Sequence, residues 1–399
     1  MNNFEFYNPV KVVFGAGEIS RTGSEAAKIG KKALLVTYKE HDFFADLISK
    51  VKALCTEAGV ETVDFFGVTA NPQIGQAIEG VEICKANDVD FIIALGGGSA
   101  MDAAKAIAAG VKYQGEMWNM VASRHDGSPV EFPHEALPTM MIPTLPATGS
   151  EMNCCGVITN EKTTEKSYFW DPCLYPVTSI VDPELTVTLP AYQTACGVAD
   201  TISHVLEFYI NGLEDTFLNN RIQESVMQTC IELGPKVLEN PNDISARSEL
   251  QWASIMAQNG ISQPGNGWTP MHQIGHVLSA RYNVAHGASL SVVMPSWMKT
   301  LNHKRSERYV TFATNVCKID PAGKTDQQII DEGIEFFRSF LVKIGVPVTF
   351  EDAKIPADEI DDIIADAVRI SFGADKILSC VPPVTMQEAT EVLQAAACK

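Results

Sequence analysis

This sequence of 399 residues has few basic residues, no long uninterrupted apolar run and no closely spaced cysteine pairs of the CxxC type. Its 30 Lys and Arg residues stand against 49 Asp and Glu, which gives a formal net charge of −19. A chain this acidic repels phosphate backbones and anionic lipid surfaces, so we expect neither nucleic acid nor a membrane as a partner. The most apolar stretch, residues 91–111, contains Asp102 and Lys105, which argues against a membrane span.

The cysteines and the first residues bear on the cellular compartment. Ten cysteines are scattered along the chain, and two of them, Cys154 and Cys155, are adjacent. Scattered cysteines in a long chain are typical of reduced thiols that pack as small hydrophobic side chains. The first residues offer neither the basic nor the apolar segment of a signal peptide. We therefore expect a cytoplasmic protein with free thiols.

The first half of the chain alternates apolar runs with helical patterns. The runs are almost continuously apolar, as in strands that are buried on both faces, and they lie at residues 33–37, 62–66, 91–95, 139–142 and 179–181. Helical periodicity fills residues 45–58 and 74–87 between them, and Gly59 follows the first of these helices. This alternation predicts an α/β domain with a parallel sheet over residues 1–188.

After about Val187 the pattern changes, because β-branched runs become rare and long helical patterns follow. One of them places Ile222, Val226 and Cys230 on the same helical face, which is the spacing of an apolar stripe packed against a core. The sequence therefore predicts a second, all-helical domain over residues 189–399.

A glycine-rich loop directly follows the expected strand at residues 91–95. The sequence Gly-Gly-Gly-Ser occupies residues 96–99 and opens an alanine-rich helical pattern. Backbone N–H groups at such a helix start favour an anion, and glycine permits its close approach, so the loop is a candidate phosphate site. We expect Ser99 as the N-cap, with Asp102 completing a pair that resembles a capping box. The alternative is a tight turn that only caps a helix, since the pattern is neither GxGxxG nor a Walker A sequence.

Aspartate and histidine residues recur at helical spacing in the second half. Asp200 and His204 are four residues apart, His272 and His276 repeat that spacing, and His286 follows ten residues later. Facing helices that carry such pairs are a usual way for a helical bundle to build a metal site. One carboxylate with two or three imidazoles suits Fe²⁺ or Zn²⁺ better than Mg²⁺ or Ca²⁺. The alternative is a set of ordinary ion pairs on helix surfaces.

Together these motifs resemble the iron-containing alcohol dehydrogenase family, and within it the butanol dehydrogenase and broad-range aldehyde reductase branch. The resemblance extends from Lys11 to the C-terminal helices, and it includes Pro-Thr-Leu-Pro-Ala-Thr-Gly-Ser-Glu at residues 143–151. It implies a dinucleotide-binding α/β domain followed by a helical metal domain. The implied activity is hydride transfer between NAD(P)(H) and a small primary alcohol or aldehyde, such as butanol or butanal. The resemblance also implies a homodimer or a larger homo-oligomer.

The resemblance assigns roles residue by residue. It implies Asp200, His204, His272 and His286 as ligands of Fe²⁺, with Zn²⁺ as the other possible ion. It implies that His276 lies near the nicotinamide without binding the metal, which makes it the catalytic candidate for proton delivery. The implied cofactor-binding residues are Gly97, Gly98, Ser99, Asp102, Asn71, Thr144, Thr148 and Lys166. For the two threonines, ordinary turn residues after a strand are the alternative.

The turn after the expected strand at residues 33–37 bears on the choice between NAD and NADP. Where relatives that prefer NAD carry an aspartate and relatives that prefer NADP carry a glycine-rich turn, this chain has Tyr38, Lys39, Glu40 and His41. Tyr38 is a candidate to stack on adenine, and Lys39 is a candidate partner for a 2′-phosphate. One alternative is that Glu40 binds the ribose hydroxyls. Another is that all three side chains point to solvent and do not discriminate between the cofactors. Because no acid occupies the position that would exclude a 2′-phosphate, the sequence weakly favours NADP(H) over NAD(H).

Two other functions fit parts of the pattern. A dehydroquinate-synthase-like lyase would share the architecture but would need basic residues around an acidic sugar substrate. Residues 260–268 contain no basic residue and include Trp268, which favours a small uncharged substrate. A non-catalytic protein that binds nucleotide or metal is the other alternative. The sequence favours the alcohol dehydrogenase or aldehyde reductase over both.

Overall fold

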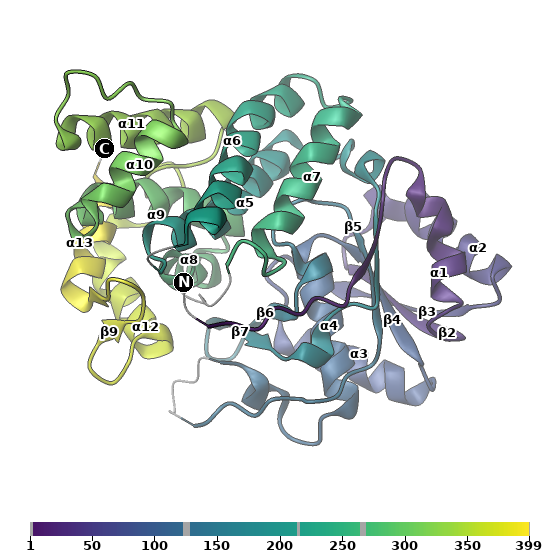
Figure 1. Cartoon of the computed structure of the whole chain (residues 1–399). Coiled ribbons are helices and arrows are strands. Elements are labelled where there is room, and N and C mark those ends of the chain that lie inside the picture. Colours follow the sequence, from purple (N-terminus) through teal and green to yellow (C-terminus); the bar gives the residue numbers. More distant parts are fainter. Residues whose placement is uncertain (1–2, 123–127, 214–215, 264–268, 399) are drawn as a thin grey trace. The chain divides into compact units, whose positions relative to one another are not determined.

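The computed structural model describes residues 3–122, 128–213, 216–263 and 269–398. The chain divides into two compact units. One unit is Tyr7–Leu189, coloured from purple to teal in Figure 1, and the other is Pro190–Lys399 together with Met1–Phe6. Each unit has its own hydrophobic core, and each is described below by itself.

The first unit is built on a six-stranded parallel sheet in the order β1-β8-β5-β4-β2-β3 (Figure 1). Its strands are β1 (Lys11–Phe14), β2 (Lys32–Tyr38), β3 (Glu61–Val68), β4 (Phe91–Gly96), β5 (Thr139–Pro143) and β8 (Thr178–Val181). The five strands expected from apolar runs are all present. The edge strand β1 was not expected; it is only four residues long and buries one of them fully.

The helices of the first unit are α1 (Thr22–Ala26), α2 (Ala45–Glu57), α3 (Ile74–Ala86) and α4 (Gly98–Lys112). Hydrophobic side chains fill both faces of the sheet, since Leu34 and Val36 belong to one cluster and Ala33 and Leu35 to another. This alternation explains why residues 33–36 of β2 are all apolar rather than apolar at every second position. The expected parallel α/β architecture is therefore confirmed.

A hairpin was not expected from the sequence. Strand β6 (Cys155–Asn160) pairs antiparallel with β7 (Glu165–Trp170). Both strands mix polar and apolar residues, and polar side chains such as Lys166 and Ser167 are among those that the fold buries. Burial of polar groups is invisible to a search for apolar runs, which is why the hairpin was missed.

The expected capping of α4 is wrong. The helix begins at Gly98 with Gly97 as its N-cap, so Ser99 lies inside the first turn, and the helix continues to Lys112. The Asp102 carboxylate accepts hydrogen bonds from Ser150 Oγ at 2.7 Å and from Val157 N at 2.9 Å. A buried aspartate thus finds its donors on another segment of the chain, and this competes with local capping.

Over the residues that the structure describes, the second unit is helical, as expected, apart from a short ribbon of β9 (Ile377–Leu378) and β10 (Val384–Thr385). Its helices are α5 (Ala191–Ile210), α6 (Phe217–Glu239), α7 (Ile244–Gln258), α8 (Pro270–Tyr282), α9 (His286–Leu301), α10 (Ser306–Asn315), α11 (Asp326–Ile344), α12 (Ile360–Ser371) and α13 (Met386–Ala397). None of the described helices combines the length and the apolar character needed to cross a bilayer.

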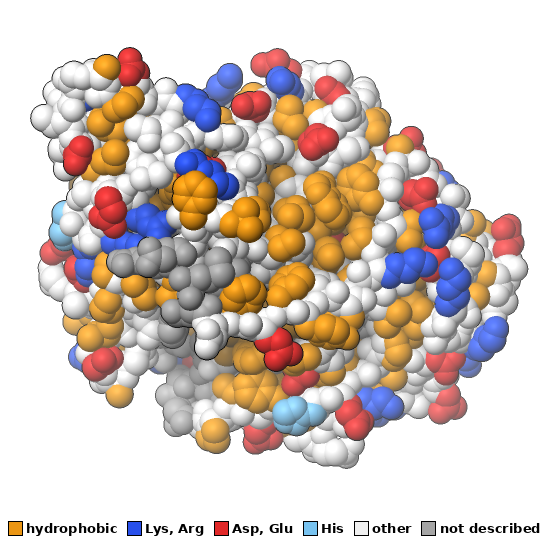
Figure 2. Space-filling model, viewed as in Figure 1, with side chains coloured by type: hydrophobic (Ala, Val, Ile, Leu, Met, Phe, Trp, Pro, Cys, Tyr) orange, Lys and Arg blue, Asp and Glu red, His pale blue; other side chains and the backbone are white. Residues whose placement is uncertain are grey.

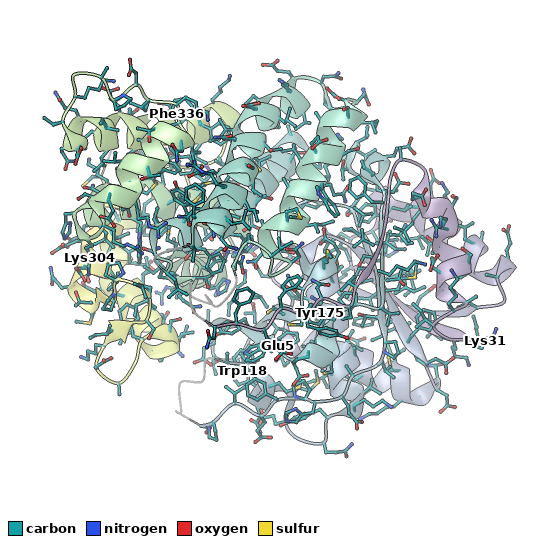
Figure 3. All side chains as sticks on the ribbon, viewed as in Figure 1. Glu5, Lys31, Trp118, Tyr175, Lys304 and Phe336 are labelled. Carbon is teal, nitrogen blue, oxygen red and sulfur yellow. The ribbon has the colours of Figure 1, made fainter. Side chains whose placement is uncertain are left out.

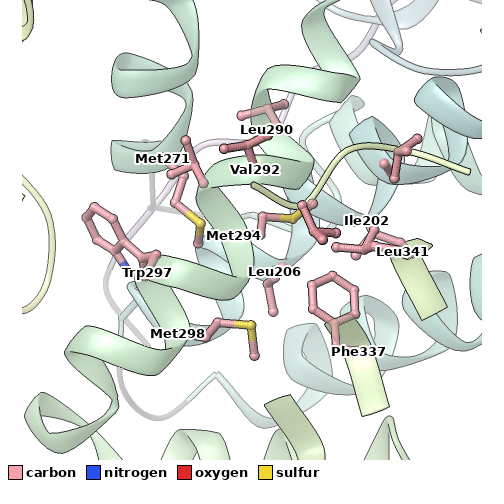
Figure 4. Close-up of a cluster of buried hydrophobic side chains, with 14 of the residues drawn as sticks. Ile202, Leu206, Met271, Leu290, Val292, Met294, Trp297, Met298, Phe337 and Leu341 are labelled. Atoms are coloured by element: carbon pink, nitrogen blue, oxygen red, sulfur yellow. The ribbon is translucent and has the colours of Figure 1, made fainter. Parts of the chain in front are cut away.

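Helix α5 lies at the centre of this unit. Every residue from Thr194 to Ile210 is buried, so the helix has no solvent-facing side over that length. Figure 4 shows Ile202 and Leu206 among side chains that include Met294, Trp297 and Phe337. A helix packed on all sides is a rigid base, and any polar group that it carries is surrounded by other helices.

Charged side chains of both signs are intermixed on the face shown in Figure 2, and no broad basic area is visible on that face. Hydrophobic side chains also reach this surface in places. The chain has several exposed large hydrophobic residues, among them Phe217, Leu218 and Tyr7.

Candidate active site

Helix α5 places a carboxylate and an imidazole one turn apart in the interior of the helical unit. Asp200 and His204 are both buried, and His204 Nε2 lies 3.5 Å from Asp200 Oδ1. Residues four apart on a helix share one face, so this pair is fixed by the backbone of α5 itself. The i, i+4 spacing noted in the sequence therefore brings the two side chains together.

Two further helices each add an imidazole to the same oxygen. His272 of α8 and His286 of α9 place Nε2 at 3.8 Å and 3.6 Å from Asp200 Oδ1. Donor atoms held about 2.1 Å from one tetrahedral ion lie roughly 3.4 Å from each other. The three observed distances are close to that value, so the Asp and His side chains fit a divalent ion such as Fe²⁺ or Zn²⁺. Asp200, His204 and His272 alone already form a group of three that could hold a metal ion.

The nitrogen of His204 that faces Asp200 is a candidate metal ligand. Among the described residues, His204 Nε2 is buried and has no hydrogen-bond partner. Burial, helped by the nearby His272, lowers the pKa of His204 well below its ordinary value. The imidazole is therefore neutral, which is the form that binds a metal ion. A buried nitrogen without a hydrogen bond is costly, and a bound ion would remove that cost.

A close approach of two helices places His286. The next residue, Gly287, has no side chain, and a Cβ there would lie 2.1 Å from the backbone oxygen of Cys196 on α5. Only glycine lets the start of α9 come this near to α5. Gly287 thus sets the distance between His286 and Asp200, and its place beside a histidine was visible in the sequence.

Glu207 is a candidate functional residue that no sequence pattern had indicated. Its buried carboxylate accepts hydrogen bonds from Met271 N at 2.7 Å and His272 N at 3.1 Å, and it also contacts His272 Nδ1. It therefore satisfies two amides in the first turn of α8 and orients the imidazole of His272. Burial raises the pKa of Glu207 well above its ordinary value, and the two N–H donors oppose that rise. The sequence feature that could have indicated Glu207 is an acidic residue three positions after His204 in an otherwise apolar helical pattern.

Replacing Glu207 by Gln is expected to weaken metal binding by about 10- to 100-fold while the protein stays folded. The amide cannot accept all three contacts at once, so the imidazole of His272 loses its fixed orientation. The check is metal content after dialysis against a graded chelator series, compared with the exposed control Glu239→Gln. Equal metal retention in both variants would remove Glu207 from this role.

The glycine loop and the threonine loop lie against each other in the first unit. Thr144 N donates to Gly96 O at 3.0 Å, and a Cβ on Gly98 would lie 2.6 Å from Thr148 Cγ2. The absence of a side chain at Gly98 therefore lets Thr148 reach the first turn of α4. The structure thus brings together Gly97, Gly98, Thr144 and Thr148, four of the residues that the resemblance implies for cofactor binding.

A fully buried lysine holds this region together, and no sequence pattern had given it a role. Lys105 Nζ donates to Ser150 Oγ at 2.9 Å, to the backbone and side-chain oxygens of Asn153 at 2.8 and 2.9 Å, and to Cys155 O at 2.7 Å. Burial raises the pKa of Asp102 and lowers that of Lys105, and each charge opposes the shift of the other. The side chain of Asp102 thus belongs to this internal network.

Asn71 and Lys166 form a second pair from distant parts of the sequence. Lys166 Nζ donates to Asn71 Oδ1 at 2.8 Å, and Lys166 is buried on β7. Asn71 has a φ of 56°, a left-handed conformation in which asparagine is one of the more frequent residues. The hairpin that was not expected from the sequence is therefore the element that positions Lys166.

Tyr38 turns back onto the glycine loop. Its hydroxyl accepts a hydrogen bond from Gly97 N at 2.9 Å, and its ring lies parallel to that of Phe44 with 6.2 Å between centroids. Burial raises the pKa of Tyr38 to about 12, so the phenol is neutral. Lys39 and Glu40 are exposed. Trp268, part of the argument for an uncharged substrate, lies outside the described residues.

Comparison with known proteins gives matches in both units. The family described as iron-containing alcohol dehydrogenase matches residues 9–183, and the C-terminal part of the Fe-containing alcohol dehydrogenase family matches residues 194–396. A probable NADH-dependent butanol dehydrogenase 1 of Bacillus subtilis is 36% identical, over 95% of this chain and 97% of its own. The NADPH-dependent aldehyde reductase YqhD of Escherichia coli is 30% identical, over 91% and 92%.

A solved structure supports the same assignment. The NADH-dependent butanol dehydrogenase A of Thermotoga maritima superposes with a TM-score of 0.91 at 36% identity, covering 100% of this chain and 99% of the other. These relatives confirm the expected fold class and the expected metal-dependent oxidoreduction of alcohols and aldehydes with NAD(P)(H), rather than a lyase reaction. The chain belongs to the iron-containing alcohol dehydrogenase family.

Proposed function

We propose that this enzyme reduces small aldehydes such as butanal, and oxidises the corresponding primary alcohols, at a centre built around Asp200. The observation that carries this proposal is the convergence of three imidazole nitrogens on Asp200 Oδ1. The names of the butanol dehydrogenase relatives support the substrate class. Loss of reduced-cofactor absorbance on addition of butanal tests the reaction directly.

We infer that Asp200, His204, His272 and His286 hold the metal, with Fe²⁺ as the expected ion and Zn²⁺ as the other one that these donors suit. Such an ion supplies Lewis acidity toward an aldehyde or alcohol oxygen. Asp200 is the one anionic group in this set, and the histidines are neutral donors on separate helices. Glu207 keeps His272 aligned from the side away from the centre.

We infer that the start of α4 binds the cofactor pyrophosphate. Gly97 and Gly98 expose backbone at a helix N-terminus, where the helix dipole favours an anion. Ser99, Thr144 and Thr148 flank this position. Asp102 accepts a hydrogen bond from Ser150, which lies two residues after Thr148, and so helps to hold this loop. Lys166, held by Asn71, adds a positive charge to the same unit. These groups bind and orient the cofactor, and the hydride chemistry is the cofactor's own.

His276 is the proposed proton-delivering residue. It is buried on α8, one turn after His272, and its ring centroid lies 5.2 Å from that of His286. His276→Ala is expected to keep its metal while kcat falls by about 10²-fold or more and the pH profile changes. Metal content and a pH–rate profile on one preparation check this, with the exposed His303→Ala as the matched control. Loss of metal in His276→Ala would make this residue a ligand instead.

The proposed cofactor choice is a weak preference for NADP(H). It is supported by the absence of an acid at Tyr38 and by the exposed Lys39, although several butanol dehydrogenase relatives are named as NADH-dependent. Lys39→Ala is expected to lower the NADPH-to-NADH ratio of kcat/KM about fivefold, because an exposed ion pair contributes about 1 kcal/mol. The control is Lys31→Ala, a remote exposed lysine. A wild type that prefers NADH, with a ratio unaffected by Lys39→Ala, would direct attention to Glu40.

The remaining parts of the proposal concern assembly and location. We propose a homodimer or larger homo-oligomer, as the family resemblance implies. We also propose a cytoplasmic location, supported by the ten cysteines, all of which are free thiols in the structure. A reducing compartment keeps such thiols free.

A further inference from the structure

Two adjacent cysteines have no part in the proposed mechanism. Six of the ten cysteines are buried and behave as small hydrophobic residues. Cys155 and Cys398 are exposed, and Cys154 and Cys173 are half-buried. Cys154 and Cys155 are the one pair of neighbours in the sequence, and they lie where the chain enters β6.

The backbone around this pair is fixed on both sides. Cys155 pairs with Trp170 across the hairpin, and the backbone oxygen of Cys154 accepts from Asp171 N at 3.3 Å. The oxygen of Cys155 accepts from the buried Lys105 at 2.7 Å. Because the two residues are held in this way, their sulfur atoms cannot separate through a movement of the main chain.

The two thiols interact with each other and with their surroundings. The two side chains lie close enough to interact, and Cys154 also lies near the hydroxyl of Tyr175, labelled in Figure 3. Cys155, with help from Tyr175 and the charge of Lys105, lowers the pKa of Cys154 to about 7. Cys154 and burial raise the pKa of Cys155 above its ordinary value. Cys154 therefore loses its proton more readily than an ordinary cysteine, and a thiolate is the reactive form.

A direct disulfide is a poor fit for this pair. Adjacent Cα atoms across a trans peptide are about 3.8 Å apart, whereas Cα atoms in disulfides are usually about 4.4 to 6.8 Å apart. One additional atom between the two sulfurs relieves that mismatch. A soft, trivalent centre that binds two thiolates has the required size and the required affinity for sulfur.

We propose that Cys154 and Cys155 form a binding site for trivalent organic arsenicals of the R–As=O class, and that occupation of this site inhibits the enzyme. Two S–As bonds form, the As=O oxygen leaves as water with the two thiol protons, and no atom changes oxidation state. The added group lies at the segment that Lys105 holds against α4. Displacement of that segment disturbs the loop that carries Thr148. The inhibition rests on the proposed function of this loop, whereas the binding site does not.

The test uses the full-length, metal-loaded enzyme and phenylarsine oxide as the probe, in a buffer with a phosphine reductant. We expect the wild type to retain one arsenic per chain after desalting and to lose most of its butanal reductase activity. A dithiol should restore the activity, and a monothiol should not. Cys155→Ser and Cys154→Ser should retain no arsenic, whereas the control Cys398→Ser should behave as the wild type does.

Several results would overturn the proposal. These are a wild type that retains no arsenic, a Cys155→Ser variant that still retains it, and inhibition that is equal in Cys155→Ser and the wild type. Peptide mapping of the wild-type adduct tests the site without a variant, because it shows whether both cysteines carry the arsenic. Absence of butanal reduction before any treatment would contradict the proposed substrate, and the arsenic measurement would still report on the site.

Discussion

Replacing His272 by Ala is expected to remove the metal and to abolish turnover, with metal affinity reduced by more than about 100-fold. Loss of a residue that only orients a ligand costs about 10- to 100-fold, so loss of a ligand itself should cost more. His272 Nε2 faces Asp200 Oδ1 at 3.8 Å, and its other nitrogen is engaged by Glu207, so this imidazole is held in the orientation of a ligand. Metal content by elemental analysis and butanal reduction on the same sample measure both effects.

The matched control for His272→Ala lies one turn further along α8. His276→Ala removes an equally buried imidazole from the same helix and should keep its metal. Nucleotide binding by the first unit should survive in both variants, since its loop belongs to a different part of the chain. Stoichiometric metal together with a near-normal rate in His272→Ala would exclude this residue from the ligand set.

Lys105→Met is expected to destabilise the first unit by about 3 to 5 kcal/mol, because it leaves the carboxylate of Asp102 buried without its partner charge. Methionine keeps most of the side-chain volume but removes the donor of four hydrogen bonds. The segment that carries Ser150 and Asn153 then loses its attachment to α4. Urea denaturation and NADH fluorescence titration measure the loss of stability and of cofactor binding.

Two variants sharpen the test of Lys105. Lys112→Met replaces an exposed lysine of the same helix and should leave stability nearly unchanged. Adding Asp102→Asn to Lys105→Met removes the buried negative charge of Asp102, so the double variant should recover part of the lost stability. If Lys105→Met is as stable as Lys112→Met, the buried network does not hold the loop.

Regular patterns in the sequence predicted the central strands and part of the candidate metal centre. The apolar runs gave the central strands, because strands covered on both faces have no polar side to interrupt the run. The spacing of Asp200 and His204 gave half of the candidate metal centre, because four residues on a helix return to the same face. The spacing also marked His272, His276 and His286 as candidates, and the family resemblance then implied that His272 and His286 are the ligands.

The features that could not be predicted from the sequence depend on contacts between residues far apart in the chain. Glu207 acts on His272, which lies 65 residues away, and Lys105 acts on Cys155, 50 residues away. No local pattern marks such a pair, because a buried acid or lysine resembles a surface charge until its partners are known. The expected cap at Ser99 was wrong for the same reason, since Asp102 bonds to Ser150 and Val157 instead.

We propose that a metal ion held at Asp200 is what enables this protein to reduce aldehydes. The most direct measurement is butanal reduction as a function of bound metal per chain, in enzyme purified without oxygen, stripped with a chelator and reloaded stepwise with Fe²⁺ or Zn²⁺. We expect no activity in the stripped enzyme and a rise in proportion to bound metal that levels off at one ion per chain. Asp200→Asn should neither take up the ion nor recover activity. Full activity in the stripped enzyme, or full metal-dependent activity in Asp200→Asn, would contradict a metal-dependent reaction at Asp200.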